Sequence, residues 1–471
     1  MTPQTTSVHP APAAALHPDA GHAAALRLIT CGSVDDGKST LIGRLLYDSR
    51  AVLQDQLTGI THAANGNALE AAIDLARLTD GLSAEREQGI TIDVAYRYFA
   101  TQARKFIIGD APGHEQYTRN MVTAASSADA AVVLVDATKL DWRADHPALL
   151  PQTRRHALLA GLLRVPSIVF AVNKLDAVKD PSAAWTHIRA ALASLAQTAR
   201  LPARAFVPIS ALKGWNVVDP CPGWAGYDGP ALLDALEQLP ATPPDANLPL
   251  ALPVQWIESN ASSSDTAQSR RVLWGRIATG RVAPGDAVQI FPSGQRAAIA
   301  QVIDRVRHPA SGIAAGQSVG VTLDRELDIS RGDWIVAAPP QPARAPQGEW
   351  GDAPAASSAS SAATSWQLKQ ELAATIAWLD DEPLAVGRVY WALHGHRWIK
   401  ARVTRIVSHL DIHTLAPEPA AQLTANAIGD VELKLQEPIP AAPYAQSRTL
   451  GALILVDAAS NKTAGAVLVR A

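Results

Sequence analysis

The most informative run of the sequence is Gly32-Ser33-Val34-Asp35-Asp36-Gly37-Lys38-Ser39-Thr40. It matches the pattern G-x-x-x-x-G-K-[ST], follows an expected strand and opens a helical stretch. Gly32 and Gly37 allow the backbone angles of a tight loop whose N–H groups can cradle phosphates. The Lys38 ammonium then belongs on the β- and γ-phosphates, and the Ser39 hydroxyl is a ligand for Mg²⁺. The run therefore predicts a nucleotide-binding loop between a strand and a helix.

Strand-like and helix-like segments alternate around this loop. The expected buried strands are Leu26–Cys31, Lys105–Gly109, Ala130–Val135, Ser167–Val172 and Ala205–Ile209. Longer helical stretches separate them, which is typical of a mostly parallel sheet covered by helices. We expect a disordered tail at residues 1–24 and an α/β P-loop domain over residues 25–242.

The second half of the chain has a different pattern. Residues 240–253 contain five prolines, which neither a helix nor a central strand tolerates, so a domain ends there. Short strand-like runs broken by turns follow, for example Ala287–Phe291, and predict a small β-barrel domain over residues 248–340. A linker rich in Ser, Ala and Pro is expected at 341–365, and a second β-barrel domain at 366–471.

A second nucleotide motif follows the strand that ends at Gly109. In Asp110-Ala-Pro-Gly113-His114, the Asp110 carboxylate can reach the metal through water, and the Gly113 N–H can sense the γ-phosphate. Alone, Asp-x-x-Gly is usually just a turn. Its position after a strand, within the series of motifs, favours a nucleotide-binding role over a simple turn.

Two further motifs select the base. Asn173-Lys174-Leu-Asp176 follows an apolar strand, and its final carboxylate can accept hydrogen bonds from N1 and N2 of guanine. Ser210-Ala211-Leu212-Lys213 comes after a further strand, where a backbone N–H can meet the guanine O6. Four motifs in this order indicate a GTP-binding, GTP-hydrolysing switch.

The order of the motifs resembles that of the translational class of P-loop GTPases. The resemblance supplies a first switch, Gly89-Ile90-Thr91, with Thr91 as the second hydroxyl ligand of Mg²⁺. It also implies that His114 orients the attacking water.

Longer runs resemble the large, GTP-binding subunit of bacterial ATP sulfurylase (sulfate adenylyltransferase). They are residues 84–99, Asp110–Met121, Asp328–Asp333, Trp378–Leu384 and Ile428–Leu433, together with Asp36 where elongation factors usually place His. In that family a separate small subunit makes adenosine 5′-phosphosulfate and pyrophosphate from ATP and sulfate, while GTP hydrolysis drives this unfavourable synthesis. The resemblance therefore implies a GTP hydrolase that forms part of a nucleotidyltransferase, in a heterodimer or larger assembly.

The expected nucleotide site follows from the motifs and the resemblance together. Contacts to GTP are expected from Gly32, Ser33, Val34, Asp35, Asp36, Gly37, Lys38, Ser39, Thr40, Asp110, Gly113, His114, Asn173, Lys174, Asp176, Ser210, Ala211 and Leu212. The expected catalytic residues are Lys38, Gly113 and His114, and the expected Mg²⁺ ligands are Ser39, Thr91 and Asp110.

The composition limits which classes of partner the chain is expected to bind. The formal net charge is −3, and no cluster of five or more basic residues is present, so nucleic acid is not favoured. No apolar run reaches the roughly 18 residues of a membrane span, so a cytoplasmic protein is expected. Cys31 and Cys221 are too few for a disulfide framework. Two alternatives stay open: a translation factor delivering a charged tRNA, and a stand-alone regulatory GTPase.

Overall fold

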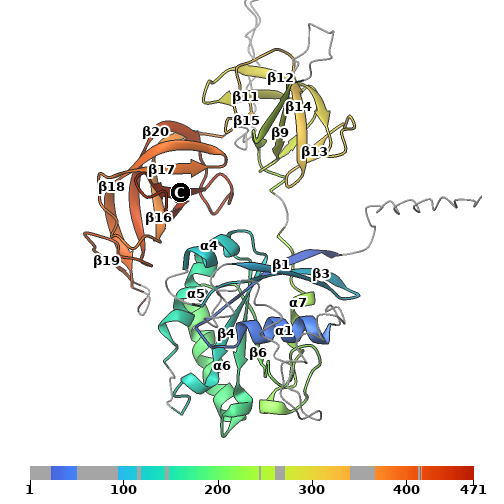
Figure 1. Ribbon diagram of the computed structural model, residues 1–471, viewed down its shortest axis with the longest axis vertical. Coiled ribbons are helices and arrows are strands. Elements are labelled where there is room, and N and C mark those ends of the chain that lie inside the picture. Colours follow the sequence, from blue (N-terminus) through green and yellow to red (C-terminus); the bar gives the residue numbers. More distant parts are fainter. Residues whose placement is uncertain are drawn as a thin grey trace, which may run out of the picture.

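The computed structural model describes residues 23–49, 94–113, 118–143, 148–242, 245–259, 271–339, 366–411, 414 and 416–470. The predicted tail, the 341–365 linker, Thr91 and His114 lie outside these residues, apart from Ala23 and Ala24. Three large sheets follow one another along the described chain, the first with helices and the other two without (Figure 1). No helix in this part of the chain is long and apolar enough to cross a membrane.

The first sheet has six strands in the order β2-β3-β1-β4-β5-β6. Its strands are β1 (Ala23–Cys31), β2 (Ala95–Ala100), β3 (Arg104–Asp110), β4 (Ala130–Asp136), β5 (Ser167–Asn173) and β6 (Ala203–Pro208). Only β2 runs antiparallel to its neighbour. All five predicted strands are present, and the predicted mostly parallel sheet is confirmed.

Helices cover both faces of this sheet (Figure 1). They are α1 (Lys38–Asp48), α4 (Thr118–Ser126), α5 (Pro151–Leu162), α6 (Pro181–Thr198) and α7 (Leu232–Glu237), with 3-10 turns η3 (Ala137–Lys139), η4 (Leu175–Ala177) and η5 (Trp224–Gly226). Successive strand residues point to opposite faces: Val132 and Leu134 pack with α1 and α7, whereas Val133 and Val135 pack with α4, α5 and α6. Burial on both sides explains why the strands are nearly continuous apolar runs.

The second large sheet is antiparallel and has the strand order β7-β15-β11-β12-β14-β9-β8. Its strands are β7 (Ala251–Pro253), β8 (Trp256–Ser259), β9 (Arg271–Arg276), β11 (Ala287–Phe291), β12 (Arg296–Ile303), β14 (Ser318–Leu323) and β15 (Trp334–Ala337), beside a small pair of β10 (Arg281–Val282) and β13 (Ile313–Ala314). The Gln255 N–H donates to the Trp274 carbonyl at 2.8 Å, so the sheet curls until the chain next to β7 meets β9.

The third large sheet closes on itself. Its strands are β16 (Leu368–Trp378), β17 (Val389–His394), β18 (Arg397–Leu410), β19 (Pro417–Glu418), β20 (Ile428–Pro440), β21 (Ala452–Asp457) and β22 (Thr463–Val469). Their order is β17-β21-β22-β16-β20-β18-β19, and an additional pairing of β17 with β18 closes six of them into a barrel. The predicted fold class, an α/β GTPase domain followed by β-barrel domains, is confirmed.

The barrel of the third sheet packs against the helical layer, and Tyr444 is one of the residues in this contact. The Tyr444 hydroxyl donates to the Leu163 carbonyl at 3.0 Å, just beyond the end of α5. Arg164 donates to the Tyr444 carbonyl at 2.6 Å. The second and third sheets meet through an ion pair between Arg397 and Asp333 at 2.8 Å.

Candidate functional site

The phosphate-binding loop joins β1 to α1. β1 ends at Cys31 and α1 begins at Lys38, so the N-terminus of α1 faces the loop. Gly37 has a φ of 92°, in the left-handed region, and a side chain there would collide with the amide of Asn173. The second glycine of the motif is therefore required by backbone conformation and by space.

Lys38 and Gly113 face each other in this site. The Lys38 ammonium donates to the Ser33 carbonyl at 2.7 Å, and a Cβ added to Gly113 would strike that ammonium. Burial lowers the pKa of Lys38, while the carboxylates of Asp110 and Asp36 oppose the shift. The predicted phosphate-binding lysine thus lies beside the predicted γ-phosphate sensor.

At the end of β3, the hydroxyls of Ser39 and Thr30 lie beside the Asp110 carboxylate. The Ser39 hydroxyl lies 3.4 Å from Asp110 Oδ2, and the Thr30 hydroxyl donates to Asp110 Oδ1 at 3.1 Å. Hydroxyl and carboxylate oxygens are the hard ligands that suit Mg²⁺, so this donor set fits the ion. Thr91, the third expected ligand, lies outside the described residues.

Asn173 holds three segments together at the end of β5. Its Nδ2 donates to the Asp36 carbonyl at 2.9 Å, and its Oδ1 accepts from the Ala211 N–H at 3.0 Å. The side chain is almost fully buried. The Ala211 N–H, one of those expected near the guanine O6, therefore donates to Asn173 in this structure.

Asp176 lies in the 3-10 turn η4, with 12% of its side chain exposed. The Lys213 ammonium stands 3.7 Å from its carboxylate and 4.5 Å from the centre of the Trp215 ring. The carboxylate expected to bind guanine is thus mostly covered and has Lys213 beside it.

The motifs come together at one edge of the first sheet. The loops after β1, β3, β5 and β6 follow strands of one sheet at their carboxyl ends, which is where open α/β sheets bind ligands. Residues 32–40, 110, 113, 173, 174, 176 and 210–212 are carried by these loops and the first turn of α1. His114 lies outside the described residues.

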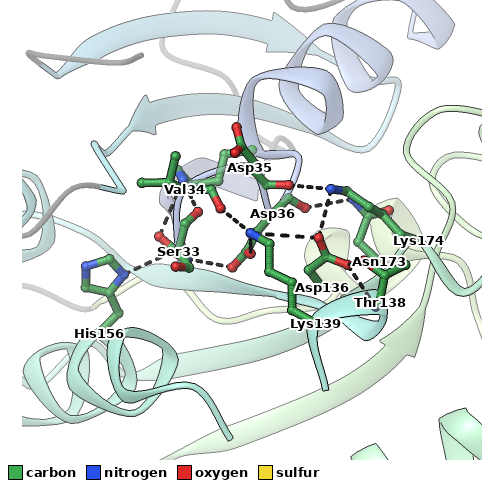
Figure 2. Close-up of polar contacts among 12 residues, drawn as sticks. Ser33, Val34, Asp35, Asp36, Asp136, Thr138, Lys139, His156, Asn173 and Lys174 are labelled. Atoms are coloured by element: carbon green, nitrogen blue, oxygen red, sulfur yellow. Dashed lines mark hydrogen bonds and ion pairs between the residues drawn. The ribbon is translucent and has the colours of Figure 1, made fainter. Parts of the chain in front are cut away.

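Sequence reasoning missed a charged cluster under the phosphate-binding loop (Figure 2). Asp136 ends β4, and Lys139 ends the following 3-10 turn. Asp136 pairs with Lys174 at 2.8 Å, and Lys139 pairs with Asp36 at 3.2 Å. Burial raises the pKa of Asp136, but hydrogen bonds from Lys174 and Thr138 outweigh it and hold the pKa below its ordinary value. No motif identifies Lys139, because its partners in the phosphate-binding loop, Val34 and Asp36, lie far away in sequence.

A histidine on α5 was also missed. His156 is fully buried, and its Nδ1 accepts the Gly32 N–H at 3.1 Å (Figure 2). The side-chain amide of Gln152 lies between this ring and the second motif, 2.8 Å from His156 Nε2 and 3.4 Å from the Gly113 carbonyl oxygen. The spacing of Gln152 and His156 by one helical turn after Pro151 is the only sequence signal for this contact.

Known families match both ends of the described fold. The profile of the elongation factor Tu GTP binding domain matches residues 24–242, and that of the GTP-eEF1A C-terminal domain-like family matches residues 371–470. Together with the four converging motifs, these matches define a GTPase of the translation-factor class.

Relatives over nearly the whole chain identify the family. Sulfate adenylyltransferase subunit 1 from Laribacter hongkongensis (strain HLHK9) is 42% identical over 448 residues, which cover 94% of this chain and 85% of that protein. The same subunit from Methylorubrum populi (strain ATCC BAA-705 / NCIMB 13946 / BJ001) is 41% identical, covering 94% and 87%. Bifunctional enzyme CysN/CysC from Xylella fastidiosa (strain Temecula1 / ATCC 700964) is 43% identical, covering 94% of this chain and 65% of that protein. The chain belongs to the sulfate adenylyltransferase subunit 1 family, which confirms the resemblance found in the sequence.

Proposed function

We propose that this chain hydrolyses GTP with Mg²⁺ at residues 32–40, and that hydrolysis drives synthesis of adenosine 5′-phosphosulfate by a separate small subunit. The observation that carries this proposal is the double hydrogen bond of Asn173. One buried amide joins the phosphate-binding loop to the 210–213 loop, so phosphate and base recognition belong to one site. The resemblance to ATP sulfurylase supplies the reaction that this site drives.

On the phosphate side, the chain's residues provide positive charge and oxygen ligands. Lys38 binds the β- and γ-phosphates, and its ammonium already lies in the loop beside Gly113. Ser39 and Asp110 hold Mg²⁺, with Thr91 completing the set. The ion supplies Lewis-acid stabilisation of the developing phosphate charge.

Hydrolysis itself depends on the second switch. His114 orients the attacking water, and the Gly113 N–H contacts the γ-phosphate. Gln152 and His156 support this arrangement, because Gln152 donates to the Gly113 carbonyl and His156 accepts the Gly32 N–H. We propose that these two residues act by position rather than on the reacting atoms.

On the base side, Asp176 accepts hydrogen bonds from guanine. Asn173 serves chiefly to position the loops, since both ends of its amide are engaged within the protein. Lys213 stays near Asp176 and limits the repulsion between this carboxylate and the nucleotide's charge.

A second polypeptide is required for the adenylyl transfer. The sequence has one G-x-x-x-x-G-K-[ST] run, and its base motif selects guanine, so ATP has no evident site in this chain. Hydrolysis can favour product only if the small subunit contacts the GTP and GDP states differently. The switch segments around Thr91 and Gly113 are the natural place for that difference. A cytoplasmic location stays a prediction.

The test is a pyrophosphate-release assay with ATP and sulfate. We expect this chain alone to hydrolyse GTP slowly and to form no adenosine 5′-phosphosulfate. Addition of the small subunit should accelerate GTP hydrolysis and yield product in proportion to the GTP consumed.

Two controls make the assay decisive. A non-hydrolysable GTP analogue separates binding from hydrolysis, and each subunit alone gives the background. Product from this chain alone would reject the division of labour. If the two subunits together form product at the same rate with and without GTP, the coupling is rejected.

A further inference from the structure

Three consecutive carbonyls of the phosphate-binding loop each accept a hydrogen bond from a different side chain (Figure 2). The Val34 carbonyl accepts from the Lys139 ammonium, the Asp35 carbonyl accepts from Lys174 at 2.5 Å, and the Asp36 carbonyl accepts from Asn173 at 2.9 Å. Lys174 and Asn173 belong to the guanine motif. Lys139 belongs to no motif and comes from the turn after β4.

The position of a carbonyl decides where the next N–H points. The peptide unit is planar and trans, so the C=O of one residue and the N–H of the following residue point in opposite directions. A cation that holds the Val34 carbonyl on one side of the loop therefore turns the Asp35 N–H to the other side. The N–H groups of such a loop are what bind phosphates.

Lys139 also neutralises a buried carboxylate within the loop. The Asp36 side chain is fully buried, accepts the Ser33 N–H at 2.6 Å and pairs with Lys139 at 3.2 Å. Burial raises the pKa of Asp36, while Lys139 and Lys38 lower it. Without Lys139, a buried negative charge would lie in the loop that must accept a polyanion.

A second acid holds Lys139 in place. Asp136 lies 2.8 Å from Lys174 and 3.9 Å from Lys139, so one carboxylate serves both lysines. Asp136 is itself fixed by the Thr138 N–H and hydroxyl, at 2.9 and 2.6 Å. The side chain of Lys139 is only one-third exposed, which limits the conformations open to it.

From these contacts we propose that Lys139 is a positioning residue of the nucleotide site. It sets the Val34–Asp35 peptide for phosphate binding and neutralises Asp36, without touching the reacting atoms. The proposal rests on residues 32–40 being the GTP site. It predicts a defect in nucleotide binding rather than in the chemical step.

The experiment compares four variants of the full chain. Lys139→Met removes the charge and the donor, Lys139→Arg retains both, and Asp36→Asn with Lys139→Met removes the two opposite charges together. Lys462→Met is the matched control, because Lys462 is exposed and lies between β21 and β22, in the barrel of the third sheet. Fluorescent GDP and a fluorescent non-hydrolysable GTP analogue report affinity, steady-state hydrolysis gives kcat and KM, and thermal melting reports folding.

We expect Lys139→Met to weaken GDP and the GTP analogue alike by about tenfold or more, the loss typical of one charged hydrogen bond. KM should rise accordingly while kcat stays within about twofold, since only binding is affected. Lys139→Arg should restore most of the affinity. The double variant should bind more tightly than Lys139→Met alone, because the unpaired Asp36 charge is gone.

Several results would overturn the proposal. They are unchanged affinity in Lys139→Met, a fall in kcat at unchanged affinity, or a double variant weaker than Lys139→Met. If Lys139→Met does not fold at the assay temperature, Lys139→Gln is measured by the same criteria. A wild-type chain that binds no GTP would instead reject the proposed function. A wild-type chain that binds GTP but ignores the small subunit would reject only the coupling.

Discussion

The His156 imidazole accepts the backbone N–H of Gly32 at 3.1 Å, which joins α5 to the first residue of the phosphate-binding loop. A neutral imidazole that accepts at Nδ1 carries its proton at Nε2. Burial, with Lys38 and Arg155 nearby, lowers the pKa of His156 from 6.5 to about 3. The loop therefore depends on a histidine that remains neutral.

This histidine predicts loss of stability in acid. Between pH 6.5 and about 3 the unfolded chain protonates the ring and the folded chain does not, so stability falls as the pH falls. At pH 5 the loss from this one group should reach about 2 kcal/mol, at 1.36 kcal/mol per unit. His156→Asn keeps an acceptor without a titrating ring and should flatten the dependence of the melting temperature between pH 7 and 5.

His394 is the matched control for that measurement. It is also fully buried, and burial lowers its pKa to about 4, but it lies on β17, in the barrel of the third sheet. His394→Asn should flatten the same pH dependence and leave GDP affinity unchanged, whereas His156→Asn should alter GDP affinity as well. Equal GDP affinity in both variants would argue against a role for His156 in the loop.

Asp176 should decide the choice of base. We expect Asp176→Asn to weaken GTP binding by about 2–4 kcal/mol, because the guanine donors meet a mismatched amide. The same variant should favour xanthosine triphosphate, whose base offers an acceptor at that position. Titration with the two nucleotides measures this change in base preference, and unchanged GTP affinity would contradict the assignment of Asp176.

Lys38 and His114 should separate binding from turnover. Lys38→Ala should abolish tight phosphate binding, because the ammonium in the loop is lost. His114→Ala should leave GTP bound and slow hydrolysis by roughly 10²-fold or more, as expected for a lost water-orienting group. Single-turnover hydrolysis of bound GTP distinguishes the two, and a native rate in His114→Ala would place that role elsewhere.

Tyr444 should help to hold the barrel of the third sheet against the end of α5. Tyr444→Phe removes the hydrogen bond to the Leu163 carbonyl and should weaken this contact by about 1 kcal/mol. Faster hydrogen exchange of the amides around Leu163 would measure the loss. Tyr98→Phe is the control, since Tyr98 is 69% exposed on β2 and far from the contact. Identical exchange in both variants would contradict the prediction.

Much of the nucleotide site could be predicted from the sequence because its motifs are local. Gly32, Gly37 and Lys38 act within one loop, and Asn173 and Asp176 lie within four residues directly after a strand. The strands themselves follow from unbroken apolar runs, which a sheet buried on both faces requires. The limits of the three folded units, 25–242, 248–340 and 366–471, stay a prediction.

The sequence by itself determined the fold class, the preference for guanine nucleotide and the family, because each is specified by short motifs with fixed spacing. Only the tertiary structure decided what supports those runs. Gly32 and His156 are 124 positions apart, and Lys139 lies 103 positions from Asp36. No spacing in the sequence predicts such contacts, because they depend on the order of β1, β4 and β5 in the sheet. The barrel of the third sheet likewise depends on long-range pairing, of β16 with β22 and of β17 with β21, which alternation of apolar residues cannot specify.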